Sequence, residues 1–283
     1  MTHKKSSRIK AFSLIELSIV LLIIGILVAG ITQSSRLIKM FRLNTAQNLT
    51  QNSPVASIED LAMWFEASTV ASIADAETVD GGAVSTWYDI NPQSNTKYNI
   101  TSSGTNKPLY SEIANGVPAL KFDGIDDSFV LSPEYTLEKK QTCIVVFKPS
   151  TSTEDGMLLA TTSNDNGRYQ IIRYVGAPGI LSSWNGIVYN PTITPSAMPQ
   201  IAVFTQNNST VQFFHNGATL ASATVNDENY KFSQVGALGT VTPTVSHFAG
   251  YIAEIIIFNR VLKIEERRAI EAYLSKKYGI LVT

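Results

Sequence analysis

The residues best placed to bind a ligand form an acidic turn, Asp123-Gly124-Ile125-Asp126-Asp127. Three carboxylates within five residues supply the oxygen ligands that Ca²⁺ prefers, and calcium is the one cofactor that the sequence indicates. The alternative is a solvated turn whose aspartates accept hydrogen bonds from their own backbone, a common use of Asp in turns. The sequence alone leaves both interpretations open.

Tryptophan side chains can stack on sugar rings, and the chain has three of them. Trp64 and Trp87 lie within strand-like segments, so we expect them in the core. Trp184 precedes Asn185-Gly186, a tight-turn signal, and is the aromatic residue expected on the surface. The candidate ligand site therefore consists of Asp123, Asp126, Asp127 and Trp184.

The sequence contains no recognised motif of a catalytic centre. A Gly-x-Ser-x-Gly elbow, a phosphate-binding loop and an HExxH zinc motif are all missing, and the three histidines are far apart. Cys143 lies in an apolar run and is expected to be buried. Glu254 stands alone in an apolar strand, where we expect it to be structural, either hydrogen-bonded or paired with Arg260. The sequence thus predicts that this chain is not an enzyme.

The charge balance excludes one class of partner. The 283 residues carry 22 basic and 23 acidic side chains, a net charge of −1, so we expect no nucleic-acid partner. With 44% hydrophobic and 16% charged residues, the composition is that of a globular protein with room for one large domain or two small ones.

A hydrophobic run from Phe12 to Ile31 predicts a single membrane-spanning helix. At 1.5 Å per residue these positions reach about 30 Å, the thickness of the hydrocarbon layer. The basic residues before the run and the lack of acidic ones there predict a cytoplasmic N-terminus. A secretory signal peptide cut near Ala29 is the alternative, but the run is long for one and contains the carboxylate of Glu16.

Glu16 is the one charged residue in this run, and a lone carboxylate in apolar surroundings needs a partner. If a leader were removed after Ala11, Phe12 would carry a new α-amino group that is cationic near neutral pH. A neighbouring subunit of a helical filament could then present that amine to Glu16. The alternative is that Glu16 lies close enough to the membrane surface to reach water.

The pattern Lys10-Ala11-Phe12-Ser13-Leu14-Ile15-Glu16-Leu17 resembles the prepilin motif of type IV pilins and type II secretion pseudopilins. The resemblance implies removal of the leader 1–11 by a prepilin peptidase in the bacterial inner membrane. It also implies methylation of Phe12 and assembly with other pilin or pseudopilin subunits through Glu16. Two departures stand out: Ala11 occupies the position that is usually Gly, and the usual helix-breaking Pro is missing.

The helix continues beyond the membrane as an amphipathic segment and ends at Asn52-Ser53-Pro54, a stop signal. The predicted order is therefore a leader (1–11), a filament helix (12–52), a linker (53–60) and a β-sandwich (61–283). The sandwich is predicted from short apolar runs that are separated by turn signals. Asn216-Gly217 predicts a two-residue hairpin of type I′, and the run 255–258 predicts a central strand covered on both faces.

The last segment, 263–278, is predicted to be a helix. Glu265 and Glu266 in its first turn and Lys276 and Lys277 in its last turn suit the helix dipole. Gly279 then provides the C-terminal cap.

Several runs in the second segment resemble laminin-G-like, concanavalin A-like jelly-roll domains. They are 61–67, 84–89, 115–127, 248–254, 258–260 and 271–274. The resemblance implies a mainly β sandwich with a C-terminal helix and a lectin-like binding or adhesion role. The function that follows is a minor pilin or pseudopilin whose periplasmic or extracellular head binds a glycan or a surface protein. The alternatives are a membrane-tethered carbohydrate-active enzyme and a periplasmic binding domain outside any filament.

Overall fold

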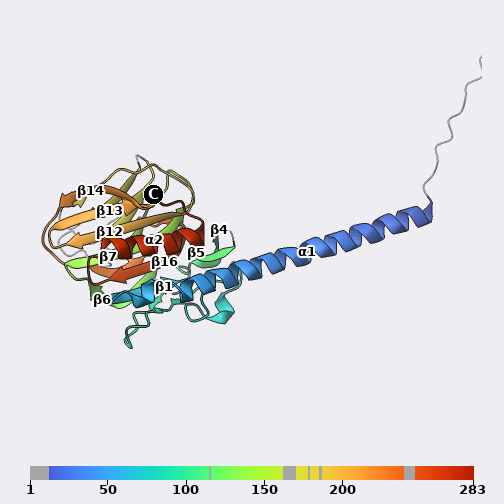
Figure 1. Ribbon diagram of the computed structural model, residues 1–283, viewed down its shortest axis with the longest axis horizontal. Helices are drawn as coiled ribbons and strands as arrows, with labels where there is room; N and C mark the ends of the chain where they lie inside the picture. Colours follow the sequence, from blue (N-terminus) through green and yellow to red (C-terminus); the bar gives the residue numbers. More distant parts are fainter. Residues whose placement is uncertain (1–12, 115, 162–169, 178, 185–186, 239–245) are drawn as a thin grey trace, which may run out of the picture. The chain divides into compact units, whose positions relative to one another are not determined.

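The computed structural model describes residues 13–114, 116–161, 170–177, 179–184, 187–238 and 246–283. Within these ranges, the side chains at 29, 31–33, 35, 36, 114, 170 and 184 lie outside the description. The chain divides into two compact units, Met1–Arg42 and Leu43–Thr283. We call the second unit the head. Figure 1 traces the chain from helix α1 into this β-rich unit, which ends with helix α2.

Helix α1 runs from Leu14 to Gln51 and ends directly before the predicted stop signal. At its start, Ser13 Oγ accepts the N–H of Ile15 at 3.3 Å, and Glu16 Oε2 accepts the N–H of Ser13 at 2.9 Å. This Ser-x-x-Glu arrangement is a capping box, which satisfies donors that the first helical turn leaves unpaired. Within the single chain, the Glu16 carboxylate therefore has a backbone partner that the sequence analysis did not anticipate.

The large apolar side chains from Leu14 to Val28 are exposed in the single chain. Among the described residues, however, no helix has the length and apolar character needed to cross a membrane. The predicted span over residues 12–31 is therefore not confirmed. It depends in part on positions 12, 29 and 31, whose side chains lie outside the description.

The head is a sandwich of two antiparallel eight-stranded sheets, which confirms the predicted mainly β fold. Sheet A contains, in spatial order, β14 (Ala218–Thr224), β13 (Thr210–His215), β12 (Gln200–Asn207), β7 (Lys140–Pro149), β16 (Ala249–Phe258), β5 (Val117–Asp123) and β4 (Leu109–Ala114), and β1 (Leu61–Glu66) also pairs with β16. Sheet B contains β11 (Val188–Tyr189), β10 (Ile180–Trp184), β9 (Gln170–Val175), β8 (Asp155–Ala160), β15 (Lys231–Val235), β6 (Phe129–Thr136), β3 (Ile100–Thr101) and β2 (Thr86–Trp87). Two short 3₁₀ helices, η1 (Val55–Ser57) and η2 (Asp75–Glu77), flank β1 in the sequence.

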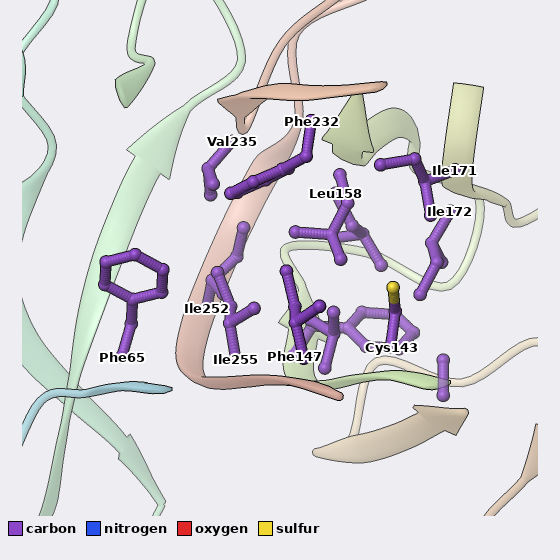
Figure 2. Close-up of a cluster of buried hydrophobic side chains, with 14 of the residues drawn as sticks. Phe65, Cys143, Phe147, Leu158, Ile171, Ile172, Phe232, Val235, Ile252 and Ile255 are labelled. Carbon is purple, nitrogen blue, oxygen red and sulfur yellow. The ribbon is translucent and has the colours of Figure 1, made fainter. Parts of the chain in front are cut away.

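The main hydrophobic core fills the space between the two sheets. Figure 2 shows part of it, with Phe65 and Phe147 from sheet A and Leu158 and Phe232 from sheet B. Cys143 belongs to the same core and is fully buried, as predicted, and burial raises the pKa of its thiol far above the usual range. Trp87 is buried here too.

A second core lies on the outer face of sheet A under helix α2 (Ile264–Tyr278). Figure 1 shows α2 running across this face, over the strands β7, β12 and β16. Strand β16 serves both cores, because alternate side chains of a strand point to opposite faces. Ile255 and Ile257 lie in the inter-sheet core, while Ala253 and Ile256 lie under α2. The prediction of a central strand covered on both faces is confirmed.

The predicted type I′ hairpin joins β13 to β14. Asn216 and Gly217 have φ angles of 48° and 84°, and His215 pairs with Ala218 across the turn. Positive φ at both central residues is what a type I′ turn requires, and Asn-Gly supplies it at little cost. The predicted C-terminal cap of α2 is also confirmed, since Gly279 is left-handed with φ 68°.

A buried charge cluster joins α2 to sheet A. Glu66 of β1 and Glu254 of β16 lie directly opposite each other in the antiparallel pairing. Lys277 of α2 donates through Nζ to Glu66 Oε1 at 2.6 Å and to Glu254 Oε2 at 3.0 Å. All three side chains are 0% exposed. The same Nζ donates to Thr50 Oγ1 at 2.7 Å, which brings the last turn of α1 into the cluster.

The cluster confirms that Glu254 is structural and hydrogen-bonded, and corrects one predicted partner. Glu254 pairs with Lys277 and accepts hydrogen bonds from Trp64 Nε1 at 2.8 Å and Tyr278 Oη at 2.9 Å. Its predicted alternative partner, Arg260, instead forms a two-point ion pair with Glu266. Lys277 lies in the last turn of the helix, as predicted, and its side chain is buried against the sheet.

We predict that Lys277→Met lowers the free energy of unfolding of the head by about 3–5 kcal/mol, because it leaves two facing carboxylates buried without a cation. Urea unfolding of the full chain in detergent micelles, followed by tryptophan fluorescence, measures the change. Lys276→Met is the matched control, since Lys276 is exposed on the same helical turn. Equal unfolding midpoints for the two variants would contradict a stabilising role of the cluster.

Candidate functional site

The acidic turn connects β5 of sheet A to β6 of sheet B. Asp123 is the last residue of β5, and Gly124 follows with φ +79°. A Cβ atom at Gly124 would approach Cβ of Ala249 to 2.7 Å, so glycine is required both by the backbone angle and by the neighbouring strand. The chain can therefore turn sharply here and bring the three aspartates back toward each other.

The three predicted carboxylates do come together. One oxygen from each of Asp123, Asp126 and Asp127 lies within 4.8 Å of the others. The backbone interpretation of the turn is also confirmed, because Asp123 Oδ1 accepts the N–H of Ile125 at 2.8 Å and Asp127 Oδ2 accepts the N–H of Asp123 at 2.9 Å. Asp126 Oδ2 accepts the hydroxyl of Thr105 at 2.7 Å. The turn is thus held by its own hydrogen bonds and keeps further carboxylate lone pairs for a cation.

The surroundings shift the pKa values of Asp127 and Asp123 in opposite directions. Desolvation, together with the charges of Asp123 and Asp126, raises the pKa of Asp127 to about 6, although a backbone N–H bond opposes the rise. For Asp123, desolvation raises the pKa, but backbone N–H donors and the charge of His247 outweigh it and hold the pKa below its usual value. At neutral pH both of these carboxylates can therefore be ionised, the form that binds Ca²⁺.

Trp184, the fourth predicted residue, is the last residue of β10 in sheet B and pairs with Val188 of β11. Its side chain lies outside the described residues, so its predicted exposure stays a prediction. Asp123 belongs to sheet A, and the structure describes no contact between the two residues. Trp64 and Trp87 are 4% and 0% exposed, as expected of core residues.

The sequence analysis missed a polar hollow of about 480 Å³. It is lined by Glu138, Lys139, Lys140, Asn208, Asn229 and Asn259. These residues come from four segments that are far apart in the sequence, and they lie in loops or, for Lys140, at the start of a strand. The only local signal is Asn208, whose φ of 55° belongs to the turn between β12 and β13.

The paired carboxylates of Glu66 and Glu254 do not form a second candidate site. Both side chains are fully shielded from solvent, and Glu254 is engaged by Trp64, Tyr273, Tyr278 and the ammonium of Lys277. A substrate cannot reach them without disruption of the packing under α2. Their role is structural.

The predicted processing site falls partly outside the structure. Ala11 and Phe12 lie outside the described residues. Glu16 is exposed and accepts the Ser13 N–H described above. The N-terminus nevertheless matches a protein-family model, the prokaryotic N-terminal methylation motif, over residues 6–32. This match confirms the predicted prepilin motif, while no curated protein is similar enough to match the chain.

Solved structures match the chain at low sequence identity. Trypanosoma rangeli sialidase in complex with 2,3-difluorosialic acid is 11% identical, with a TM-score of 0.52, and the match covers 78% of this chain and 33% of that chain. The same sialidase in complex with sialic acid is 13% identical, with a TM-score of 0.51 and coverages of 88% and 39%. Domain 4 of a GH43 extracellular arabinanase from Geobacillus stearothermophilus, in complex with arabinotriose, is 16% identical, with a TM-score of 0.48 and coverages of 75% and 97%.

These matches concern the fold. The chain spans little more than a third of the length of the sialidases it matches. At 11–13% identity the sialidases share an arrangement of strands with this chain, and residues and substrates do not transfer. The finer prediction of a laminin-G-like domain stays a prediction.

The prediction that the chain is not an enzyme is contradicted by these neighbours, because the fold occurs in sialidases. The prediction depended on missing sequence motifs. Catalytic carboxylates of glycan-cleaving enzymes are brought together by the tertiary structure, so they need leave no local motif in the sequence. Composition and local motifs therefore do not decide whether a chain with this fold is an enzyme.

We predict that Asp127→Asn stabilises the metal-free head at pH 8 but not at pH 4. Folding raises the pKa of Asp127 from 3.8 to about 6, so its contribution is fully favourable below pH 3.8 and is lost as the pH rises through about 6. We expect a gain of about 1 kcal/mol at pH 8, discounted for screening by water. Urea unfolding at both pH values measures it.

The control for this experiment is Asp80→Asn, since Asp80 is exposed and outside the turn. Millimolar CaCl₂ should stabilise the unmodified chain at pH 8 and have less effect on Asp127→Asn, because a bound ion favours the folded state by mass action. An unchanged midpoint for the unmodified chain with calcium would count against the metal site.

Proposed function

We propose that the chain is a filament subunit of the type IV pilin or type II pseudopilin kind whose head binds a glycan or a surface protein. The observation that carries this proposal is the methylation motif over residues 6–32, which leads directly into the 38-residue helix α1. A helix of 38 residues is about 57 Å long, well beyond the average helix of a globular domain. The head would then be the part that each subunit displays.

Processing and assembly would involve two kinds of partner. A prepilin peptidase would cut between Ala11 and Phe12, and other pilin or pseudopilin subunits would pack against α1. In the filament, the new α-amino group of Phe12 in one subunit would pair with Glu16 of a neighbour. The exposed apolar side chains from Leu14 to Val28 support this packing, because they need a partner or a lipid environment.

Before assembly, the subunit would be anchored once in the bacterial inner membrane with its N-terminus in the cytoplasm. The basic leader supports this orientation, since cytoplasmic flanks carry an excess of Lys and Arg. The head would lie in the periplasm, or outside the cell once it is part of a pilus. The fold shared with sialidases, which were solved with sialic acid ligands, supports a carbohydrate as the ligand of the head.

In this proposal, Ca²⁺ would bind at Asp123, Asp126 and Asp127, where it would order the turn and offer open positions to sugar hydroxyls. The support is the convergence of three carboxylates within 4.8 Å. Trp184 would stack on the sugar.

A second candidate function, a tethered glycan-cleaving enzyme, is favoured by one observation. Asp127 and Asp123 lie together, and the pKa of the first is raised to about 6 while that of the second is lowered. A protonated acid beside an ionised carboxylate is the division of roles that glycoside hydrolysis requires.

We predict that the mature protein begins with N-methylated Phe12 and that Glu16→Ala abolishes its incorporation into filaments without loss of membrane insertion. The physical reason is loss of the anionic partner of the Phe12 amine. N-terminal mass spectrometry and immunoblotting of sheared filaments measure the two results. An intact Met1, or a start near Ala29, would exclude the pilin proposal.

Glu16→Gln is the matched control for this prediction. Glutamine still accepts the Ser13 N–H and keeps the capping box, but it carries no charge. Failure of both variants supports charge pairing between subunits. Normal incorporation of Glu16→Gln would show that Glu16 acts only as a helix cap.

For the second candidate, we predict that the full chain releases the fluorophore from fluorogenic glycosides with a rate that falls above about pH 6, because the acid form of Asp127 is lost there. Asp123→Asn and Asp127→Asn should each lower the rate by at least 100-fold, while Asp80→Asn should not. Equal rates in all three variants would eliminate this site as the catalytic one.

A further inference from the structure

The polar hollow that the sequence analysis missed has the size and chemistry of a ligand site. Its volume of about 480 Å³ lies within the range of roughly 300–1,000 Å³ that ligand pockets occupy. Its lining residues are all polar or charged and lie where loops and strand ends meet, the usual position for binding residues. We define the amide hollow as the space lined by Glu138, Lys139, Lys140, Asn208, Asn229 and Asn259.

The walls of the amide hollow are held in place by hydrogen bonds between segments. The N–H of Asn208 donates to the carbonyl of Lys139 at 2.8 Å, which joins the β12–β13 turn to the segment before β7. Gln206 Nε2 donates to the carbonyls of Asn208 and Glu228, both at 2.9 Å, and so fixes the chain next to Asn229. The walls are therefore positioned before any ligand arrives, which limits the entropy lost on binding.

Asn259 forms the remaining wall. Its backbone N–H donates to the carbonyl of Asp60 at 2.9 Å, and its side-chain Nδ2 donates to Tyr135 Oη at 2.7 Å. Its Oδ1 is shielded from bulk solvent and accepts no hydrogen bond from the described protein atoms. Tyr135 itself packs edge-on against Tyr98, with ring centroids 4.9 Å apart. These contacts fix the orientation of the Asn259 amide at the wall of the amide hollow.

The charges around the amide hollow balance. Lys139 is 3.3 Å from Asp227 in an ion pair, and Glu138 offsets Lys140. Two positive and two negative groups leave a net charge of zero, so the hollow does not favour an anionic ligand over a neutral one. Three carboxamides offer both donors and acceptors, which is the pairing that hydroxyl groups require.

We propose that the amide hollow binds a neutral oligosaccharide through hydrogen bonds between its hydroxyls and Asn208 and Asn229. This inference rests on the proposed function, in which the head binds a glycan, and it places that glycan away from the acidic turn. Because no charge pairing is involved, binding needs neither calcium nor low ionic strength.

The test uses the full chain in detergent micelles on an array of neutral and acidic oligosaccharides, with and without EDTA. Asn229→Ala should weaken binding of the best neutral glycan at least tenfold, since it removes a hydrogen bond to the sugar. Asn95→Ala is the matched control, because Asn95 is exposed and does not line the hollow. Asp126→Asn and EDTA should leave binding unchanged. Equal urea midpoints confirm that each variant is folded.

The outcomes separate this inference from the proposed function. Loss of neutral-glycan binding in Asn229→Ala, with full binding in Asp126→Asn, supports the amide hollow. Loss in Asp126→Asn or with EDTA, with full binding in Asn229→Ala, overturns the inference and leaves the proposed function intact. Binding of acidic glycans alone also overturns it. If the unmodified chain binds no glycan, both the inference and the glycan-binding part of the proposed function are wrong.

Discussion

Lys277 places a buried ammonium between Glu66 and Glu254, two carboxylates that face each other across neighbouring strands. Like charges directly opposite in a sheet repel, and burial adds a desolvation cost for each. Desolvation accordingly raises the pKa of Glu254, while Lys277 opposes the rise. The pairing of β1 with β16 at this point therefore depends on α2, because Lys277 of α2 brings a cation to the two carboxylates. This contact therefore joins α2 to strands β1 and β16 of sheet A.

The same cluster includes Thr50, which belongs to the last turn of α1. Ala46 is 2% exposed, and Gln47 Nε2 donates to the carbonyl of Ser68 at 2.9 Å. The end of α1 is thus part of the folded head rather than of a flexible connection. This explains why the compact units divide at Leu43, inside the helix, and not at the linker 53–60.

In the head, the polar groups that stabilise the core differ from those at the proposed ligand sites. The buried carboxylates of Glu66 and Glu254 are engaged in the fold, while the proposed ligand sites are the acidic turn and the amide hollow. The acidic turn is formed by five consecutive residues, and its geometry follows from local hydrogen bonds. The amide hollow needs four distant segments, so it forms only when the tertiary structure brings them together. The two surfaces differ in charge, which makes them suited to different ligands.

Features with local causes could be predicted from the sequence. The methylation motif, the Asn216-Gly217 hairpin, the Gly279 cap and the convergence of Asp123, Asp126 and Asp127 all depend on residues close together in the chain. The continuous apolar run 255–258 was enough to predict a strand that is buried on both faces. Only the tertiary structure could decide the partner of Glu254, the burial of Lys277 and the position of Asn259, because each depends on contacts between segments far apart in the sequence. The sequence by itself therefore determined the motif, the turns and the fold class, and long-range packing decided which charges are buried and which polar groups remain available to a ligand.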